Sequence, residues 1–402
     1  MFSIEITALT RRALAVTAAP ALALLLAACG PTGRPQTASP NLSAPTTPVE
    51  SGDLAAPAGA AGPRPKVALI LPLTQGGKPS AVGEALRNAA DLAMSEAGAN
   101  DIALVVKDDS STPDGARAAT QAALAEGAEL IIGPLYAPNV REAGRIAKAA
   151  GKPVIGFSTD ASVGSRGVYL LSFLIESYVD RVVEQAIARG KKNFAALAPE
   201  NDYGNVAINA LVDLAGKRGL RVQVERYAAG SPGPAVQKLA ANAAQIDALF
   251  IAEQAENMSQ LAGILGANGL DSKRVQILGT GLWNDARVLS LPALQGAWFA
   301  APEGSGFNAF AGRYRAKYGA DPARIATLSY DAVSLAAALA RTQGQARFAD
   351  STLTNSSGFN GTDGVFRFTQ DGLNERGLAV MQIGSGSATV LTPAPKSFGP
   401  AS

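Results

Sequence analysis

Short apolar runs alternate with stretches of helical periodicity from residue 66 almost to the end of the chain. Residues 67–71 are continuously apolar, which is typical of a strand buried on both faces of a sheet. In the next stretch, 83–97, apolar residues recur at helical spacing from Leu86 to Ala93 and form one stripe. The pattern therefore predicts a buried strand followed by an amphipathic helix.

The same alternation continues through the body of the chain. It predicts further strands at 102–106, 130–132, 153–157, 194–198, 221–227, 248–252 and 275–278. Between them it predicts helices at 113–126, 139–150, 176–189, 206–217, 235–244 and 258–268, with two later helices at 308–318 and 325–341. Three short strands with glycine turns follow at 365–369, 378–383 and 388–392. Strands that alternate with helices of this length form parallel sheets joined by right-handed crossovers.

The pattern begins a second time after residue 175, so we expect an α/β fold of two doubly wound lobes rather than one large sheet. In doubly wound sheets, ligands bind outside the carboxyl ends of the strands. Two lobes that face each other with these ends inward would enclose a cleft. The loops at these ends supply hydroxyl groups, carboxylates and aromatic rings, which suit a small polar ligand. The candidate cleft residues are Thr74, Asp109, Tyr136, Ser158, Thr159, Asp160, Tyr203, Glu253 and Trp283.

Some of these residues have an equally good structural explanation. Asp109 could cap a helix or be solvated, and Tyr136 and Trp283 could pack at the interface of the two lobes.

The first 65 residues have a different composition. Arg11 and Arg12 precede a short apolar run that ends at the only cysteine, Cys29, as in a secretory signal. The Pro-, Ser- and Ala-rich stretch that follows cannot bury enough apolar surface to offset its ordering entropy. We therefore expect a signal peptide over 1–28 and a disordered tether over 29–65.

Composition excludes several classes of function. The chain has no histidine and a formal net charge of +2, without a basic run. Histidine-dependent nucleophiles and histidine-type zinc sites are therefore excluded, and nothing indicates nucleic-acid binding. Phosphate-binding and dinucleotide-binding glycine motifs are missing as well. We expect a protein that is not an enzyme and has no cofactor and no metal.

The residues before Cys29, Leu-Ala-Ala, resemble the lipobox of bacterial lipoproteins. In that family the cysteine becomes the first mature residue and carries the lipid, so the resemblance implies an anchor to the membrane. Gly30 follows it, whereas Gram-negative lipoproteins retained in the inner membrane mainly have aspartate there. The expected location is the periplasm, with the lipid anchor in the outer membrane.

The order of elements over 66–395 resembles the type I periplasmic binding fold of leucine-binding proteins. Supporting stretches include Glu-Leu-Ile-Ile-Gly-Pro at 129–134 and Phe-Asn-Gly-Thr-Asp-Gly at 359–364. The resemblance implies three crossings of the chain between the lobes, near 172–176, 299–303 and 342–362. The implied first lobe covers 66–174 and 302–345, and the implied second lobe covers 175–301 and 360–395.

Ile-Leu-Pro-Leu-Thr at 70–74 and Gly-Pro-Leu-Tyr-Ala-Pro-Asn-Val at 133–140 resemble the carboxyl-terminal domain of LppC/LpoA-type lipoproteins. These proteins activate penicillin-binding proteins, the enzymes that build peptidoglycan. The resemblance implies an activator of peptidoglycan synthesis whose partner is a penicillin-binding protein. The alternative is the solute-binding receptor of an ABC transporter for amino acids or amides, with an ABC permease as its partner.

The pattern of amino-acid receptors matches only in part. Ser158 and Thr159 fall at one loop that binds the ligand's carboxylate in that family, but Ala137 and Pro138 replace donors at the other. The carboxylate that binds the ammonium group would fall near Gly281, which has no side chain. An unpaired buried ammonium would cost several kcal/mol, so we do not expect a standard leucine site.

Substitution of Cys29 by alanine tests the proposed anchor. Because the tether separates the anchor from the core, Cys29→Ala is expected to release the protein from membranes and leave its fold unchanged. Fractionation after a carbonate wash, together with circular dichroism of the released protein, measures both effects. Wild-type protein that carries no lipid and washes off in carbonate would contradict the assignment.

Overall fold

The computed structural model describes residues 64–97 and 100–399, and the signal peptide, Cys29 and most of the proposed tether lie outside these residues. All the described residues belong to one compact unit, Ala60–Ser402. No helix among the described residues combines the length and apolarity needed to cross a membrane.

The first lobe is built on a five-stranded sheet in the order β4-β1-β5-β6-β7, and all of its strands pair in parallel. Its strands are β1 (Lys66–Leu71), β4 (Ala103–Asp108), β5 (Ala128–Ile132), β6 (Val154–Gly156) and β7 (Val168–Leu170). A two-stranded hairpin of β2 (Thr74–Gln75) and β3 (Lys78–Pro79) follows β1. Five of the six residues of β1 are buried, as expected for a central strand covered on both faces.

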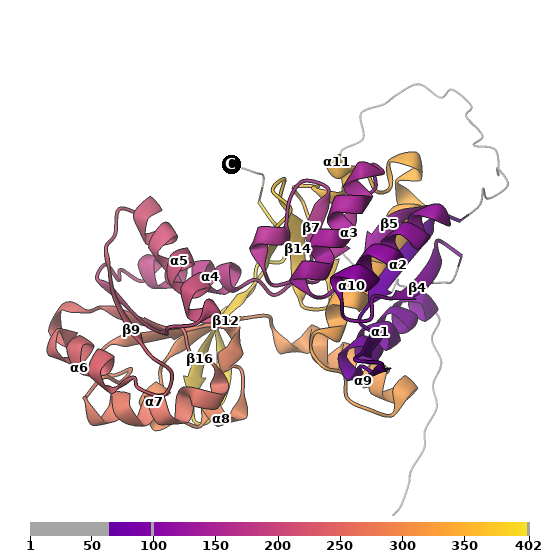
Figure 1. Ribbon diagram of the computed structural model, residues 1–402. Helices are drawn as coiled ribbons and strands as arrows, with labels where there is room; N and C mark the ends of the chain where they lie inside the picture. The colour runs from indigo at the N-terminus through magenta and orange to yellow at the C-terminus, as the bar shows by residue number, and fades with distance from the viewer. Residues whose placement is uncertain (1–63, 98–99, 400–402) are drawn as a thin grey trace, which may run out of the picture. The chain divides into compact units, whose positions relative to one another are not determined.

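Helices cover both faces of this sheet (Figure 1). The helices of the first lobe are α1 (Ala81–Ala97), α2 (Pro113–Ala125), α3 (Ala137–Ala149), α9 (Gly304–Tyr318), α10 (Ala326–Thr342) and α11 (Asp350–Leu353). Side chains of α1 and α10 pack on one face around Leu69 and Ile132, while α2 and α3 pack on the other around Ile70 and Ile131. The alternation of neighbours in β1 thus divides the lobe into two apolar layers.

A small antiparallel sheet joins the first lobe. It consists of β13 (Phe359–Gly361), β14 (Gly364–Phe368) and β15 (Asn374–Arg376). Phe366 and Phe368 belong to the same apolar cluster as Leu69, and Phe368 contacts Tyr169 with 5.4 Å between ring centroids. The expectation that the second lobe includes everything from residue 360 to 395 is therefore wrong for 360–376, because the aromatic residues of this stretch are buried against the first lobe.

The second lobe is built on a seven-stranded sheet in the order β17-β16-β12-β11-β10-β8-β9. The strands are β8 (Phe194–Pro199), β9 (Val222–Tyr227), β10 (Ala248–Ile251), β11 (Gln276–Gly279), β12 (Trp298–Ala301), β16 (Ala379–Gly384) and β17 (Ser387–Thr392), of which the last two pair antiparallel. The helices are α4 (Ile175–Ala188), α5 (Asp202–Lys217), α6 (Gly233–Ala241), α7 (Ala255–Ala267) and α8 (Ala286–Leu289). Two apolar clusters, one on each face of the sheet, form the core.

The parallel α/β architecture confirms the predicted fold class. Strands β7, β12, β13 and β15 had not been predicted. Each is three or four residues long, which is too short for its periodicity to stand out from the neighbouring loops.

The chain passes between the lobes at 171–174, 302–303 and 377–378. The third crossing therefore follows β15 and does not lie near 342–362, because the chain first completes the small sheet of the first lobe. Two reciprocal hydrogen bonds join Ser172 of the first crossing to Asn374 of β15, which leads into the third crossing: Ser172 N–H donates to Asn374 Oδ1 over 3.2 Å, and Asn374 Nδ2 donates to the Ser172 carbonyl over 3.1 Å. Arg376 Nε donates to the same carbonyl over 2.9 Å.

The assignment of β14 to the first lobe can be tested with Phe366→Ala. Because Phe366 is fully buried, its loss is expected to destabilise the protein by about 3–5 kcal/mol. Hydrogen exchange is expected to accelerate in β1 and β5 and to stay slow in β8 and β10, since the two lobes have separate apolar clusters. Val390→Ala, at a residue that is 49% exposed, is the control and is expected to change stability by less than about 0.5 kcal/mol. Faster exchange confined to β8 and β10 would contradict the assignment.

Candidate functional site

A pocket of about 410 Å³ lies between the two lobes, and we call it the interlobe pocket. Both lobes and two of the crossings contribute to its wall. It is lined by Thr159, Phe173, Ile175, Tyr178, Tyr203, Thr280, Gly281, Leu282, Asn284, Ala301, Pro302, Arg324 and Ile325.

The topology explains why these residues meet. Tyr203 lies in the first turn of α5, directly after β8, and Thr280 and Gly281 follow β11, so the carboxyl ends of parallel strands supply this part of the wall. Tyr178 lies in the first turn of α4, after the first crossing. Arg324 belongs to the first lobe and precedes α10.

Tyr178 occupies the space beside Gly281. A Cβ atom at position 281 would lie 2.7 Å from Cε1 and 2.8 Å from Cζ of Tyr178. The absence of a side chain at Gly281 thus has a physical reason, because the tyrosine ring fills the place that a carboxylate would need. The neighbouring Tyr203 hydroxyl is hydrogen-bonded to Thr280 Oγ1 over 2.7 Å.

The Tyr178 hydroxyl forms no hydrogen bond with any described residue, although the side chain is almost fully buried. Burial raises the pKa of Tyr178 to about 12, and the positive charges of Arg376 and Arg324 oppose this shift. The hydroxyl is therefore protonated at neutral pH and can donate a hydrogen bond into the pocket.

Arg324 brings a cation to the pocket. Its Nη2 is paired with Asp363, which is fully buried and also accepts a hydrogen bond from Thr327 Oγ1 over 2.7 Å. The guanidinium group lies over the ring of Phe307, 4.8 Å from its centroid. These contacts fix one side of the guanidinium, while a third of the side chain is exposed.

A second hollow of about 690 Å³ adjoins the pocket and shares Thr159, Ile175 and Tyr203 with it. Three carboxylates line this hollow: Asp160, Glu176 and Asp202. Glu176 Oε2 is buried without a hydrogen-bond partner in the described part of the chain, and burial raises the pKa of this carboxyl. Acidic groups therefore gather in the adjoining hollow, while none of the described residues that line the interlobe pocket is acidic.

Of the cleft residues predicted from the sequence, Thr159 and Tyr203 lie in the wall of the interlobe pocket and Asp160 lies in the adjoining hollow. Asp160 also caps a short 3-10 helix by accepting from Ser162 N–H over 2.9 Å. Ser158 is buried and accepts from Asp160 N–H over 3.0 Å. The structure thus brings this loop to the cleft but turns the serine inward.

The other predicted residues of the first lobe have local roles. Thr74 Oγ1 donates to Asp108 over 2.6 Å, and the half-buried Tyr136 precedes α3 and does not line the interlobe pocket. Asp109 is fully buried and accepts from Asn139 Nδ2 over 2.9 Å, and burial raises the pKa of its carboxyl. The prediction that Asp109 faces the cleft is wrong, because it ties its loop to α3.

The predictions that Glu253 and Trp283 face the cleft are also wrong. Trp283 is fully buried in the core of the second lobe, where Nε1 donates to the Glu253 carbonyl over 3.1 Å. The Glu253 carboxylate accepts from the Tyr227 hydroxyl, from Gln254 N–H and from Asn257 Nδ2. Both side chains therefore stabilise the lobe.

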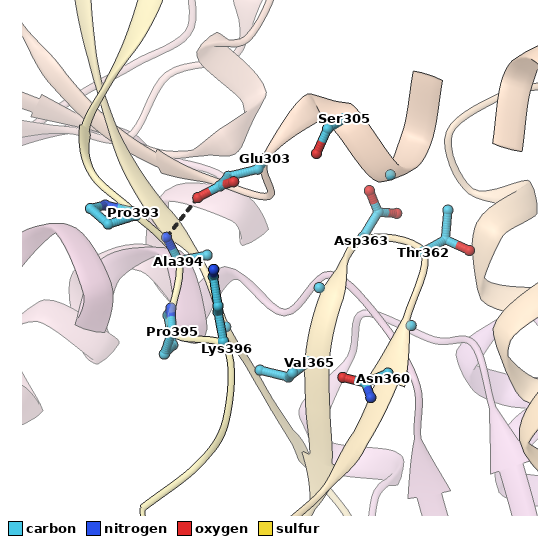
Figure 2. A pocket seen from close by; sticks show the side chains of 14 residues that line it. Glu303, Ser305, Asn360, Thr362, Asp363, Val365, Pro393, Ala394, Pro395 and Lys396 are labelled. Atoms are coloured by element: carbon cyan, nitrogen blue, oxygen red, sulfur yellow. Dashed lines mark hydrogen bonds between the residues drawn. The ribbon is translucent and has the colours of Figure 1, made fainter. Parts of the chain in front are cut away.

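Figure 2 shows another pocket, of about 490 Å³, which we call the hinge pocket. It lies beside the second and third crossings and is lined by Glu303, Asp363, Gly377 and Lys396 among others. Its carboxylates already have partners, since Glu303 Oε1 accepts from Ala394 N–H over 2.9 Å and Asp363 pairs with Arg324. In the interlobe pocket, the Tyr178 hydroxyl has no hydrogen-bond partner among the described residues and the Arg324 guanidinium is paired on one side only. The interlobe pocket is therefore the better candidate for a ligand site.

Two residues of the pocket wall, Tyr178 and Arg324, were not predicted from the sequence. Tyr178 lies near the start of the predicted helix 176–189, and Arg324 directly precedes the predicted helix 325–341. Neither segment has a recognisable motif. Their proximity depends on how the crossings place α4 against the loop before α10, which a linear pattern does not reveal. The glycine at position 281, which leaves room for the ring of Tyr178, was the one sequence feature that pointed to this part of the wall.

The comparison with family models identifies the family of this chain. The family model described as periplasmic binding protein matches residues 65–388, so the chain belongs to this family. Proteins of this family are typically solute binders without enzymatic activity, and the family indicates a periplasmic location. No curated protein matches the chain in sequence.

Solved structures share the fold. A Rhodospirillum rubrum protein assigned to branched-chain amino acid ABC transport has a TM-score of 0.72 and 19% identity, covering 82% of this chain and 100% of its own. A Desulfitobacterium hafniense substrate-binding protein in complex with leucine has a TM-score of 0.58 and 19% identity, covering 82% of this chain and 100% of its own. A Rhodopseudomonas palustris solute-binding protein in complex with 3,4-dihydroxybenzoic acid has a TM-score of 0.56 and 20% identity, covering 83% of this chain and 98% of its own.

Within the described part of the chain, no group of three histidine, cysteine, aspartate or glutamate residues is arranged to hold a metal ion.

The contact between Gly281 and Tyr178 yields a stability prediction. Gly281→Ala places a methyl group against the ring and is expected to destabilise the protein by about 1–3 kcal/mol. Gly263→Ala, in the exposed face of α7 with open space around it, is the matched control and is expected to stabilise by about 0.4–1 kcal/mol. Denaturant titration of both variants measures the difference. Equal stability of the two variants would show that the ring does not pack on Gly281.

Proposed function

We propose that this protein is a solute-binding receptor of the ABC-transporter type, which captures a small organic molecule in the interlobe pocket. The observation that carries this proposal is the pocket itself, whose wall comes from both lobes and contains a donor and a cation with unused bonding capacity. Its volume of about 410 Å³ lies in the range of small-molecule sites. The partner would be an ABC permease.

The structural neighbours support the class but do not select the ligand. One neighbour was solved with leucine and another with 3,4-dihydroxybenzoic acid, although both are about equally similar to this chain. At 19–20% identity they share the fold, so the ligand must be inferred from the residues of this pocket.

Activation of a penicillin-binding protein is the second candidate. It is favoured by the stretches at 70–74 and 133–140 and by the loss of the ammonium-binding position at Gly281, where Tyr178 fills the space. An activator acts through an exposed surface and needs no solute. Stimulation of glycan polymerisation or cross-linking by a class A penicillin-binding protein of the same organism would support it.

The two candidate functions differ in the membrane to which Cys29 would be attached. The proposed lipid anchor and the outer-membrane address at Gly30 suit an activator that reaches inward from the outer membrane. A receptor that serves an inner-membrane permease is better placed on the inner membrane. Separation of the two membranes on a density gradient locates the protein.

Binding of a solute can be measured as thermal stabilisation of the full chain. A ligand at 100 times its Kd adds about 2.7 kcal/mol of stability, which for a protein of this size raises Tm by at least about 1–2 °C. A panel of organic acids, amino acids and amides is expected to contain at least one ligand that produces this shift.

Two variants make this assay specific. Leu282→Trp fills the interlobe pocket and is expected to abolish the shift, because Leu282 lines the pocket and is 45% exposed. Val390→Trp, at an exposed site of β17, is the control and is expected to retain it. No shift with any solute, together with stimulation of the penicillin-binding protein, would overturn the receptor and favour the activator.

A further inference from the structure

We propose that the interlobe pocket takes a small monocarboxylate with a flat apolar body and no ammonium group, and that Arg324 and the hydroxyl of Tyr178 bind its carboxylate. This inference rests on the proposed function as a solute receptor and specifies its ligand class.

The body of the pocket is apolar and largely aromatic. Three rings contribute to the wall, those of Phe173, Tyr178 and Tyr203, and they come from the first crossing and two different helices. The remaining apolar lining consists of Ile175, Leu282, Ala301, Pro302 and Ile325. Flat surfaces of this kind favour a planar or extended apolar group.

Arg324 is the only charged residue in the described wall of the pocket. Among the described residues, its guanidinium has a single hydrogen-bond acceptor, Asp363, which is bonded to Nη2. The other N–H groups of the planar fork have no acceptor among residues 64–97 and 100–399, while the side chain is one-third exposed. A guanidinium with a free edge is suited to a carboxylate, because it can form two parallel charge-assisted hydrogen bonds.

Tyr178 adds a second donor. Its hydroxyl has no partner in the described part of the chain and lies in a pocket whose other tyrosine hydroxyl is already bonded to Thr280. The charges that act on this hydroxyl are those of Arg376, Arg324 and Asp363, of which two are positive. Arg376 is buried, and its Nη1 and Nη2 have no hydrogen-bond partner among the described residues. An anion near Tyr178 would therefore be stabilised by both cations.

An ammonium group finds no counter-ion in this wall. No aspartate or glutamate lines the described interlobe pocket, and the ring of Tyr178 fills the space beside Gly281. Glu176 Oε2, which has no hydrogen-bond partner among the described residues, lies in the adjoining hollow, where the charge of Asp160 acts on it. A zwitterion would have to reach from Arg324 into this hollow to be paired at both ends.

Three probes that differ in one group test the ligand class. Calorimetric titration of the full chain compares 3-phenylpropanoate, L-phenylalanine, which adds the ammonium group, and 3-phenylpropanamide, which lacks the charge. We expect 3-phenylpropanoate to bind at least about 10-fold more tightly than either of the others, because each of them loses or leaves unpaired one charged interaction.

Tyr178→Phe removes only the unpartnered hydroxyl and is expected to weaken 3-phenylpropanoate about 10-fold without loss of stability. Tyr136→Phe, which removes a hydroxyl outside the interlobe pocket, is the matched control and is expected to have no effect. Arg324→Gln is expected to abolish binding of the carboxylate, and Arg324→Lys to restore it in part. If the Arg324 variants do not fold because Asp363 is left unpaired, Tyr178→Phe still decides the outcome.

Other results overturn the inference in distinguishable ways. Tighter binding of L-phenylalanine that is lost in Glu176→Gln would assign the site to amino acids, and equal binding of the amide would exclude a carboxylate site; both leave the receptor in place. An unchanged affinity of Tyr178→Phe for 3-phenylpropanoate would show that the hydroxyl does not bind the ligand. No binding of any probe at millimolar concentration would overturn the ligand class and would also count against the receptor.

Discussion

The ion pair between Arg324 and Asp363 is the interaction on which the candidate site depends. Asp363 has no exposed surface, so its charge must be compensated inside the protein, and Arg324 and Thr327 provide this. Removing one partner of a buried pair costs about 3–5 kcal/mol. The pair also fixes the loop before α10 against the turn between β13 and β14. This contact holds Arg324, the one cation among the described residues that line the interlobe pocket.

Much of the fold could be predicted from hydrophobic patterning. The buried strands of both lobes read as continuous apolar runs, and the helices between them carry clear apolar stripes, so the alternation was legible in most of the chain. The short strands β7 and β12 were missed because three or four residues carry too little periodicity. The place of β13–β15 in the first lobe depends on long-range burial of Phe366 and Phe368, which local patterning does not encode.

The candidate site was predictable only where it follows from strand ends. Thr159 and Tyr203 follow the carboxyl ends of parallel strands, and they do reach the pocket. The same rule misplaced Trp283 and Asp109, because a residue after a strand can turn into the core as easily as into the cleft. Arg324 could not be found in this way, since it lies between two helices rather than after a strand.

The hydrogen bonds between the first crossing and β15, which leads into the third crossing, restrict how the two lobes can move. Ser172 and Asn374 each donate to and accept from the other, and both groups are buried. Sliding the first crossing along β15 would break two buried hydrogen bonds at once, whereas bending the two segments together keeps them. Domain movements divide into hinge and shear types, and this arrangement disfavours shear at these crossings. Any closure of the lobes would therefore be a rotation in which the first crossing and the end of β15 move together.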